Sequence, residues 1–222
     1  MDNRRAILDA IRAALKDPRP QALVPHRERP RPPAPALAKG LDRFREVFAE
    51  LQGQYAEARS AAEVGAALER LVSTRGLRRV FATDTPRLAR MNVRETLRRL
   101  GVFCASPYRP DEAGAHPRPA DLDALVTGAD LVIAESGTLV HVAKPGEGRM
   151  TTLTAPLHVV LFTADQVVDT LEEAIARLGP AVASGERSCV TLISGPSRTA
   201  DIEKQLFIGV HGPGALHALR VG

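Results

Sequence analysis

The sequence predicts an α/β protein with a three-layer arrangement around a mainly parallel sheet. Its 222 residues suit one domain of this class with an appendage, and 44% hydrophobic and 25% charged residues are ordinary for a chain with a sizeable core. From residue 79 onward, short apolar runs typical of buried strands alternate with segments of helical spacing. Strands that alternate with helices indicate a parallel sheet that is covered on both faces.

The N-terminal part of the chain is expected to form a separate arm. Apolar residues recur at helical spacing over residues 3–16, which predicts a short amphipathic helix. Seven of the 17 prolines follow between residues 18 and 35, which indicates an extended, semi-rigid linker. We therefore expect two parts, a helical arm with a basic linker at residues 1–36 and an α/β domain at residues 37–222.

The elements of the α/β domain follow from spacing and apolar runs. Helical stripes predict helices at residues 41–55, 64–72, 88–100 and 168–178, with a further short helix near 120–127. Apolar runs predict strands at residues 79–83, 102–105, 130–134, 138–142, 158–162, 188–193, 206–210 and 216–221. Open sheets of this type bind ligands beyond the carboxyl ends of their strands. The loops that follow the strands are therefore the places to look for chemistry.

The formal net charge of +4 lies entirely on the arm. Residues 1–36 contain eight basic and four acidic residues, and residues 37–222 contain 22 of each. One short apolar stripe is marginal in water by itself, so we expect the arm to dock onto a partner protein or a second copy of the chain. Nucleic acid is the weaker alternative, because the arm has no aromatic residue and no recognisable binding motif.

Cysteine and histidine usage gives no expectation of a cofactor or metal in this chain. Cys104 and Cys189 are far apart in apolar contexts, which favours two buried thiols in a reducing cytoplasm over a disulfide or a reactive thiol. An iron–sulfur cluster usually takes four thiolates, and no histidine pair has the spacing of a zinc site. No apolar run approaches the roughly 20 residues that span a bilayer, so a cytoplasmic protein is expected.

The first informative loop follows the run DLVIA and contains Glu135, Ser136, Gly137 and Thr138. Glycine permits a tight turn and lets a ligand approach the backbone closely. Glu135 could then act as a base, a nucleophile or a hydrogen-bond acceptor. A polar turn between two strands, with hydroxyls that cap backbone groups, is an equally good interpretation.

The second loop follows the run SCVTLI, and its candidate ligand-binding residues are Gly195, Ser197, Arg198, Thr199 and Asp201. Its hydroxyls and acidic residues are typical of a helix start, where free N–H groups attract anions. Arg198 would add a bidentate donor, so the loop suits a carboxylate or a phosphate. The alternative is ordinary helix capping with an Arg–Asp pair. Neither a Walker A loop nor a GxGxxG turn is present.

The third loop is the glycine-rich turn at residues 209–214, between the last two expected strands. His211 lies in this turn and could be a ligand or a proton carrier. A histidine that is simply satisfied within a turn is the more common case. Three other histidines, His141, His158 and His217, lie mostly in apolar strand contexts.

Taken together, four segments resemble the LUD-domain family. They are ADLVIAESGTLV, APLHVVLF about twenty residues later, SGPSRTADIE and GVHGPGALHALRV. The resemblance covers about residues 40 to 222 and is strongest from residue 130 to the end. It implies a fold like that of CoA transferases, ribose-5-phosphate isomerase and glucosamine-6-phosphate deaminase.

The resemblance also implies a role in oxidising L-lactate to pyruvate through a multi-protein, iron–sulfur-dependent system. This chain has no cluster cysteines and no flavin or nicotinamide fingerprint. Electrons would therefore pass through iron–sulfur clusters on partner subunits of the lactate utilization system. This chain would bind a small carboxylate or phosphate, complete a shared site or organise the complex.

The alternative is a stand-alone small-molecule enzyme of the CoA-transferase and sugar-phosphate isomerase superfamily. The turn at Glu135 is similar to the Glu-Asn-Gly turn that holds the nucleophilic glutamate of CoA transferases, which makes Glu135 the candidate catalytic residue. Two departures count against acyl transfer: Ser136 takes the place of the asparagine, and Thr85-Pro86 follows an earlier strand where a glycine-rich turn is expected. Fold analogy alone does not decide between the two functions.

Overall fold

The structure, a computed structural model, describes residues 3–15, 40–105, 121–144, 150–183, 189–199 and 207–222. Two compact units, residues 1–36 and residues 37–222, make up the chain.

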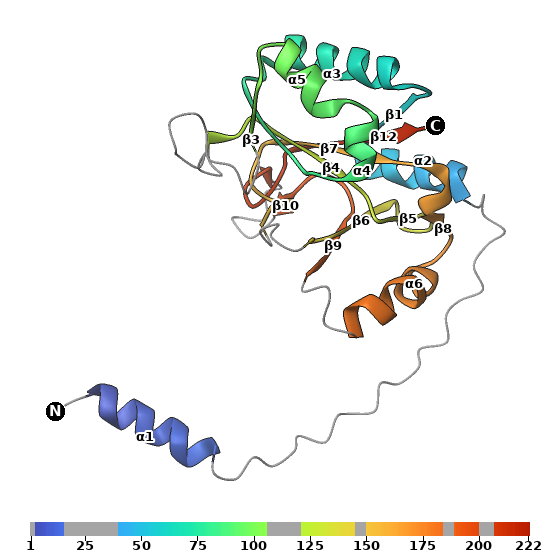
Figure 1. Cartoon of the computed structure of the whole chain (residues 1–222). Helices are drawn as coiled ribbons and strands as arrows, with labels where there is room; N and C mark the ends of the chain where they lie inside the picture. The colour runs from blue at the N-terminus through green and yellow to red at the C-terminus, as the bar shows by residue number, and fades with distance from the viewer. Residues whose placement is uncertain (1–2, 16–39, 106–120, 145–149, 184–188, 200–206) are drawn as a thin grey trace. The chain divides into compact units, whose positions relative to one another are not determined.

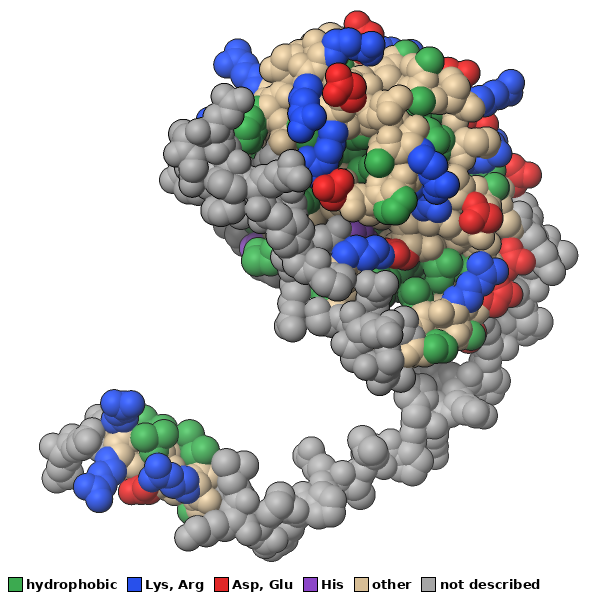
Figure 2. Space-filling view, viewed as in Figure 1, with side chains coloured by type: hydrophobic (Ala, Val, Ile, Leu, Met, Phe, Trp, Pro, Cys, Tyr) green, Lys and Arg blue, Asp and Glu red, His purple; other side chains and the backbone are tan. Residues whose placement is uncertain are grey.

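Helix α1, Asn3–Leu15, is the described part of the first unit, and it confirms the expected amphipathic helix. Its apolar side chains gather along one side (Figure 2). The apolar residues Ile7, Leu8 and Ile11 of this helix are 60%, 40% and 50% exposed. The predicted linker lies outside the described residues.

The second unit is built on a six-stranded, entirely parallel sheet (Figure 1). The strand order is β1, β12, β7, β4, β2, β3. Their bounds are Gln54–Ala58, Ala215–Val221, Leu157–Phe162, Ala124–Gly128, Arg79–Ala82 and Phe103–Ala105. An α/β fold with a mainly parallel central sheet is thereby confirmed.

Three helices cover one face of the central sheet: α3 (Ala61–Arg75), α4 (Pro86–Arg90) and α5 (Val93–Arg99). Ser60 begins α3 by accepting a hydrogen bond from the Glu63 amide, and Gly76 ends it in the left-handed conformation. Apolar residues of the three helices and of the sheet form the largest core of the domain.

The other face of the central sheet is covered by helix α2 (Gly40–Glu50) and a second sheet of four strands. The second sheet has the order β8, β5, β6, β9, with bounds Val167–Val168, Leu131–Ile133, Thr138–Val142 and Val190–Ile193. A 3₁₀ turn at Ala164–Gln166 leads into β8. Helix α6, Leu171–Ala183, packs on the outer face of this sheet (Figure 1). The layer on this face of the central sheet therefore contains a second sheet as well as a helix, whereas in most α/β folds it contains helices only.

Helix α2 packs between the two sheets through aromatic side chains. Phe44 stacks on Phe48 at 5.0 Å and meets the ring of Phe162 edge-on at 5.5 Å. The helix ends at Glu50 because Gln52 has a φ of 66° and the Gly53 amide bonds back to the Phe48 carbonyl. The expected helical stripe through Tyr55 is therefore wrong at its end, since Tyr55 lies in β1.

Two glycine turns press against the end of α2. Gly137 has a φ of 58°, and a Cβ atom there would lie 2.8 Å from the backbone nitrogen of Phe48. At Gly195 the φ is 88°, and a Cβ atom would lie 2.7 Å from the carbonyl oxygen of Leu51. Both positions therefore need glycine for two independent reasons, the left-handed backbone and the close approach of a neighbouring backbone.

Two expected helices are corrected by the structure. The helix expected near residues 120–127 is wrong: β4 lies there, and all five of its residues are buried between β7 and β2. A short apolar run fits either state by spacing, and burial among strands decides it. The helix expected at residues 88–100 is two helices, because Asn92 has a φ of 53°.

The helix start expected in the second loop has its first turn, with Asp201, outside the described residues. Arg198–Thr199 forms strand β10, which pairs in antiparallel fashion with β11, Phe207–Ile208. Val168, which was assigned to the following helix, belongs to β8 and pairs with β5. No helix in the described part of the chain has the length and apolar character needed to cross a membrane.

We expect Gly137→Ala to lower the free energy of unfolding by about 3 kcal/mol, because left-handed strain and overpacking against α2 add together. Gly76→Ala is the matched control: its φ is 64°, but nothing lies within 4 Å of the added Cβ atom. The control should lose only about 1 kcal/mol. Urea denaturation of both variants measures the difference, and equal losses would contradict the close approach to α2.

Candidate functional site

The first predicted loop connects β5 to β6, and its polar groups have partners within the fold. Glu135 Oε1 accepts a hydrogen bond of 2.9 Å from the Leu171 amide at the start of α6. A carboxylate at a helix N-terminus is a stabilising arrangement. The hydroxyl of Ser136 lies 2.7 Å from that of Thr138. The capping interpretation of this loop therefore has direct support, and a catalytic role for Glu135 stays a prediction.

The second loop lies against the first. Thr138 Oγ1 is 2.7 Å from Ser194 Oγ, which joins the two loops across 56 residues of sequence. Arg198 donates from Nη2 to the Leu51 carbonyl oxygen at 2.6 Å, at the end of α2. The Arg198 side chain is exposed. It thus holds the end of α2 from the molecular surface.

The third loop packs against the second. The Ser197 amide donates to the Pro213 carbonyl at 2.8 Å, and the Gly209 amide donates to the Ser197 carbonyl at 2.9 Å. His211 is exposed in this turn. Asp201 lies outside the described residues.

The structure therefore brings together three predicted loops that are far apart in sequence. We call residues 135–138, 194–199 and 209–214 the three-loop surface. Three of its exposed residues, Ser136, Arg198 and His211, have side chains that can donate a hydrogen bond. Such groups can bind a carboxylate or a phosphate, so recognition of an anion here stays a prediction.

A buried polar cluster between the two sheets was missed in the sequence. We call Thr83, Thr127, His141 and His158 the inter-sheet polar cluster. His158 is fully buried, and its Nε2 atom lies 2.8 Å from Thr127 Oγ1. His141, on the facing strand β6, places Nδ1 3.3 Å from the Gly128 carbonyl. Each sheet thus contributes one histidine to the cluster.

Thr83 completes the inter-sheet polar cluster at the carboxyl end of β2. Its amide donates to the Val126 carbonyl at 3.0 Å, so the strand ladder places it beside Thr127 on the same face. The Thr83 hydroxyl and Nδ1 of His158 are buried and have no hydrogen-bond partner among the described residues. Buried polar atoms of this kind are rare and often mark functional sites.

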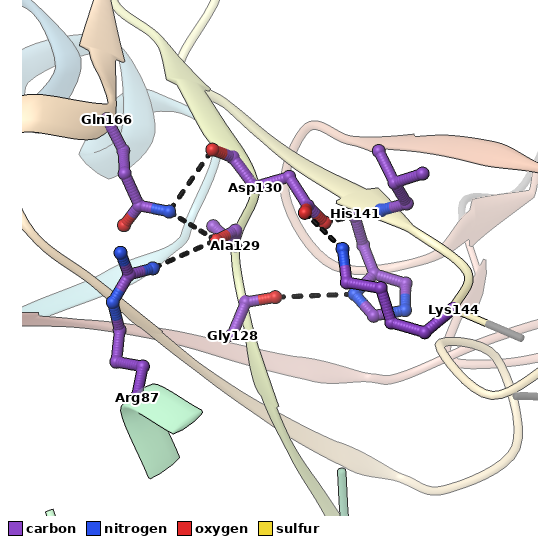
Figure 3. A network of polar contacts seen from close by, with 8 residues as sticks. Arg87, Gly128, Ala129, Asp130, His141, Lys144 and Gln166 are labelled. Carbon is purple, nitrogen blue, oxygen red and sulfur yellow. Dashed lines mark hydrogen bonds and ion pairs between the residues drawn. The ribbon is translucent and has the colours of Figure 1, made fainter. Parts of the chain in front are cut away.

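The chain crosses from the central sheet to the second sheet at residues 128–130, beside this cluster (Figure 3). The Ala129 carbonyl accepts bonds from Arg87 and Gln166. Asp130 accepts a bond of 2.7 Å from the Val142 amide and pairs with Lys144. These bonds fix the crossover, and with it the separation of His141 from His158.

The electrostatics keep His158 neutral. Burial, and to a smaller extent the charge of His141, lower the pKa of His158 to about 3. A neutral imidazole donates at one nitrogen and accepts at the other, and the threonine hydroxyls do both. The cluster can therefore hold a hydroxyl, carbonyl or carboxyl group by hydrogen bonds. Within the described residues, no group of three or more histidine, cysteine or acidic side chains could hold a metal ion.

Only some members of the inter-sheet polar cluster could have been predicted from the sequence. His158 and Thr127 each lie in an apolar run that forms a buried strand, and a polar residue in such a run is a signal in itself. The partners come from β2, β4 and β7 of the central sheet and from β6 of the second sheet, which meet only because the two sheets face each other. Their meeting was therefore invisible before the fold was known.

We expect the free energy of unfolding to fall as the pH is lowered from 6.5 toward 4. The unfolded chain binds a proton at His158 below a pKa of 6.5, whereas the folded chain does so only at about 3. His158 alone should contribute a slope of about 1.4 kcal/mol per pH unit in this window.

His158→Gln is the control for this prediction, because it removes the titrating group and retains polar atoms beside Thr127. The pH slope of this variant, measured by urea denaturation, should be smaller than that of the wild type. Identical slopes would show that His158 is not the buried neutral group.

Comparison with known proteins agrees with this fold. The LUD domain matches residues 41–221. Lactate utilization protein C of Halalkalibacterium halodurans is 32% identical over 149 residues, which are 66% of this chain and 64% of that protein. The matched part is thus less than two thirds of that relative's length.

Two matches in Deinococcus radiodurans are longer. Its lactate utilization protein C is 28% identical over 217 residues, which cover 97% of this chain and 94% of that protein. The crystal structure of a DUF162 family protein from the same organism superposes with a TM-score of 0.60 and 24% identity, over 82% of this chain and 96% of that one. The structural match supports the fold, and the domain match shows that this chain belongs to the LUD domain family.

Proposed function

We propose that this protein takes part in the utilization of L-lactate, as a subunit of a system that oxidises L-lactate to pyruvate. The observation that carries the proposal is the match to lactate utilization protein C of Deinococcus radiodurans, which extends over 94% of that relative. A match of that extent includes the three-loop surface and the inter-sheet polar cluster of this chain.

In this proposal the electrons leave through partner proteins. Oxidation of L-lactate to pyruvate releases two electrons and two protons, so it needs an acceptor. The sequence has two cysteines, and Cys104 and Cys189 are both free thiols. Since an iron–sulfur cluster usually takes four thiolates, we place the clusters on partner subunits.

The contribution of this chain would be to bind a small carboxylate or to organise the complex. Arg198 and His211 on the three-loop surface supply basic groups for an anion. The inter-sheet polar cluster supplies neutral donors and acceptors, which suit a hydroxyl or a carbonyl oxygen. The three-loop surface and the inter-sheet polar cluster thus offer hydrogen-bonding groups that suit a 2-hydroxy acid and its keto product.

Deletion of the gene in its host should abolish growth on L-lactate as sole carbon source and leave growth on pyruvate unchanged. Pyruvate enters metabolism after the proposed step, so it controls for a general defect. A plasmid that carries the full chain should restore growth on lactate. Normal growth of the deletion strain on L-lactate would overturn the proposal.

The same strain tests the alternative, a stand-alone enzyme with Glu135 as its catalytic carboxylate. Glu135→Gln keeps an oxygen that can accept from the Leu171 amide and removes only the charge. We expect this variant to restore growth on L-lactate. Loss of growth, with unchanged stability in urea denaturation, would instead favour the catalytic role.

Partner subunits are tested by co-purification. A tagged copy of the full chain, expressed from its native locus, should retain untagged proteins, and the purified complex should contain iron. Purified alone, the chain should not oxidise L-lactate with an artificial electron acceptor. Turnover by the isolated chain, or a purified complex without iron, would contradict the proposal that iron–sulfur clusters on partner subunits carry the electrons.

A further inference from the structure

A cavity of about 220 Å³ lies between helix α3 and the edge of the central sheet formed by β1 and β12. It shares no residue with the three-loop surface or with the inter-sheet polar cluster. His217 and Val159, which line it, belong to the sheet face that α3 covers, whereas His158 belongs to the opposite face. The cavity is therefore separate from the candidate site.

Much of the cavity wall is apolar. Ala56, Val159 and Leu219 line it from the sheet, and Ala67 and Leu71 line it from α3. All five side chains are small or branched. Four of them, all except Ala56, belong to the core under α3 or pack against it. An apolar wall of this size suits a short alkyl group and offers little to an inorganic ion.

The polar part of the cavity is formed by His217 and Arg70. The Nε2 atom of His217 is buried and has no hydrogen-bond partner among the described residues. Arg70, on the exposed side of α3, lines the same cavity with its neighbour one turn later, Thr74. A buried ring nitrogen without a partner is costly, and a ligand atom in the cavity would satisfy it.

The charge balance of the cavity favours an anion. None of its lining residues is acidic, and Arg70 is basic. Burial, followed by the charge of Arg75, lowers the pKa of His217, so its imidazole is neutral near pH 7. A neutral imidazole can donate one N–H bond beside a guanidinium that supplies the charge.

We propose that this cavity binds a small monocarboxylate with a short alkyl group. The carboxylate would accept bonds from Arg70 and from Nε2 of His217, and the alkyl group would lie against Val159, Leu219 and Leu71. The site is independent of the lactate role. Only the choice of L-lactate and pyruvate as probes rests on the proposed function.

Titration of the isotope-labelled full chain tests this site by NMR. Propionate, L-lactate, pyruvate and inorganic phosphate are the probes. At least one monocarboxylate should shift the amides of Gln54, Ala56, Leu71 and His217 in a saturable way, with a dissociation constant on the order of 1 mM. Phosphate should not saturate these shifts. Absence of saturable shifts with all three monocarboxylates, or equal binding of phosphate, would overturn the proposal.

Three variants locate the binding. Arg70→Gln should weaken it about tenfold, because a charge-assisted bond is lost. Ala67→Leu should abolish it by filling the cavity, and thermal unfolding should show that the variant is folded. Arg99→Gln, at an exposed position of α5, is the matched control and should bind as the wild type does.

Equal weakening by the two arginine variants would indicate a general charge effect and overturn the site. So would unchanged binding by folded Ala67→Leu. The growth experiments remain separate, since saturable binding of propionate alone supports the cavity whether or not deletion of the gene affects growth on lactate.

Discussion

The contact of helix α2 with two glycine turns is the constraint on which the rest of the domain depends. The helix fills the space between the two sheets, with Phe44 and Phe48 fully buried. At its end, Gly137 and Gly195 approach the helix backbone more closely than any side chain would allow. One turn belongs to the second sheet and the other leads to strand β10. Their close approach therefore fixes the second sheet on the first and brings the three predicted loops together.

This arrangement changes how the polar motifs are understood. Glu135 caps α6, Thr138 bonds to Ser194, and Arg198 holds the Leu51 carbonyl, so each motif has a structural task. Elsewhere in the domain, some buried polar atoms have no hydrogen-bond partner among the described residues. Thr83 and His158 between the sheets are the clearest cases. Chemistry in this fold is therefore to be sought both on the three-loop surface and at the inter-sheet polar cluster.

Much of the fold could be predicted from the chain, because buried parallel strands form continuous apolar runs that differ from helical stripes. The runs at 131–133 and 157–162 became strands as expected. The run at 124–128 is strand β4 where a helix is expected, since a five-residue apolar segment fits either state until its neighbours are known. The candidate loops could be found for the same reason, as polar residues directly after apolar runs. Their partners could not, because Thr138 and Ser194 are 56 residues apart.

The sequence by itself determined the α/β class, the amphipathic α1 and the family to which residues 41–221 belong, because these depend on local spacing and motif order. Tertiary structure alone decided that a second sheet covers one face, that the glycine turns pack on α2, and that His158 meets Thr127. The physical reason is strand order. Strand β4 lies between β7 and β2, and β12 lies between β1 and β7, so residues become neighbours through pairings that no local pattern encodes.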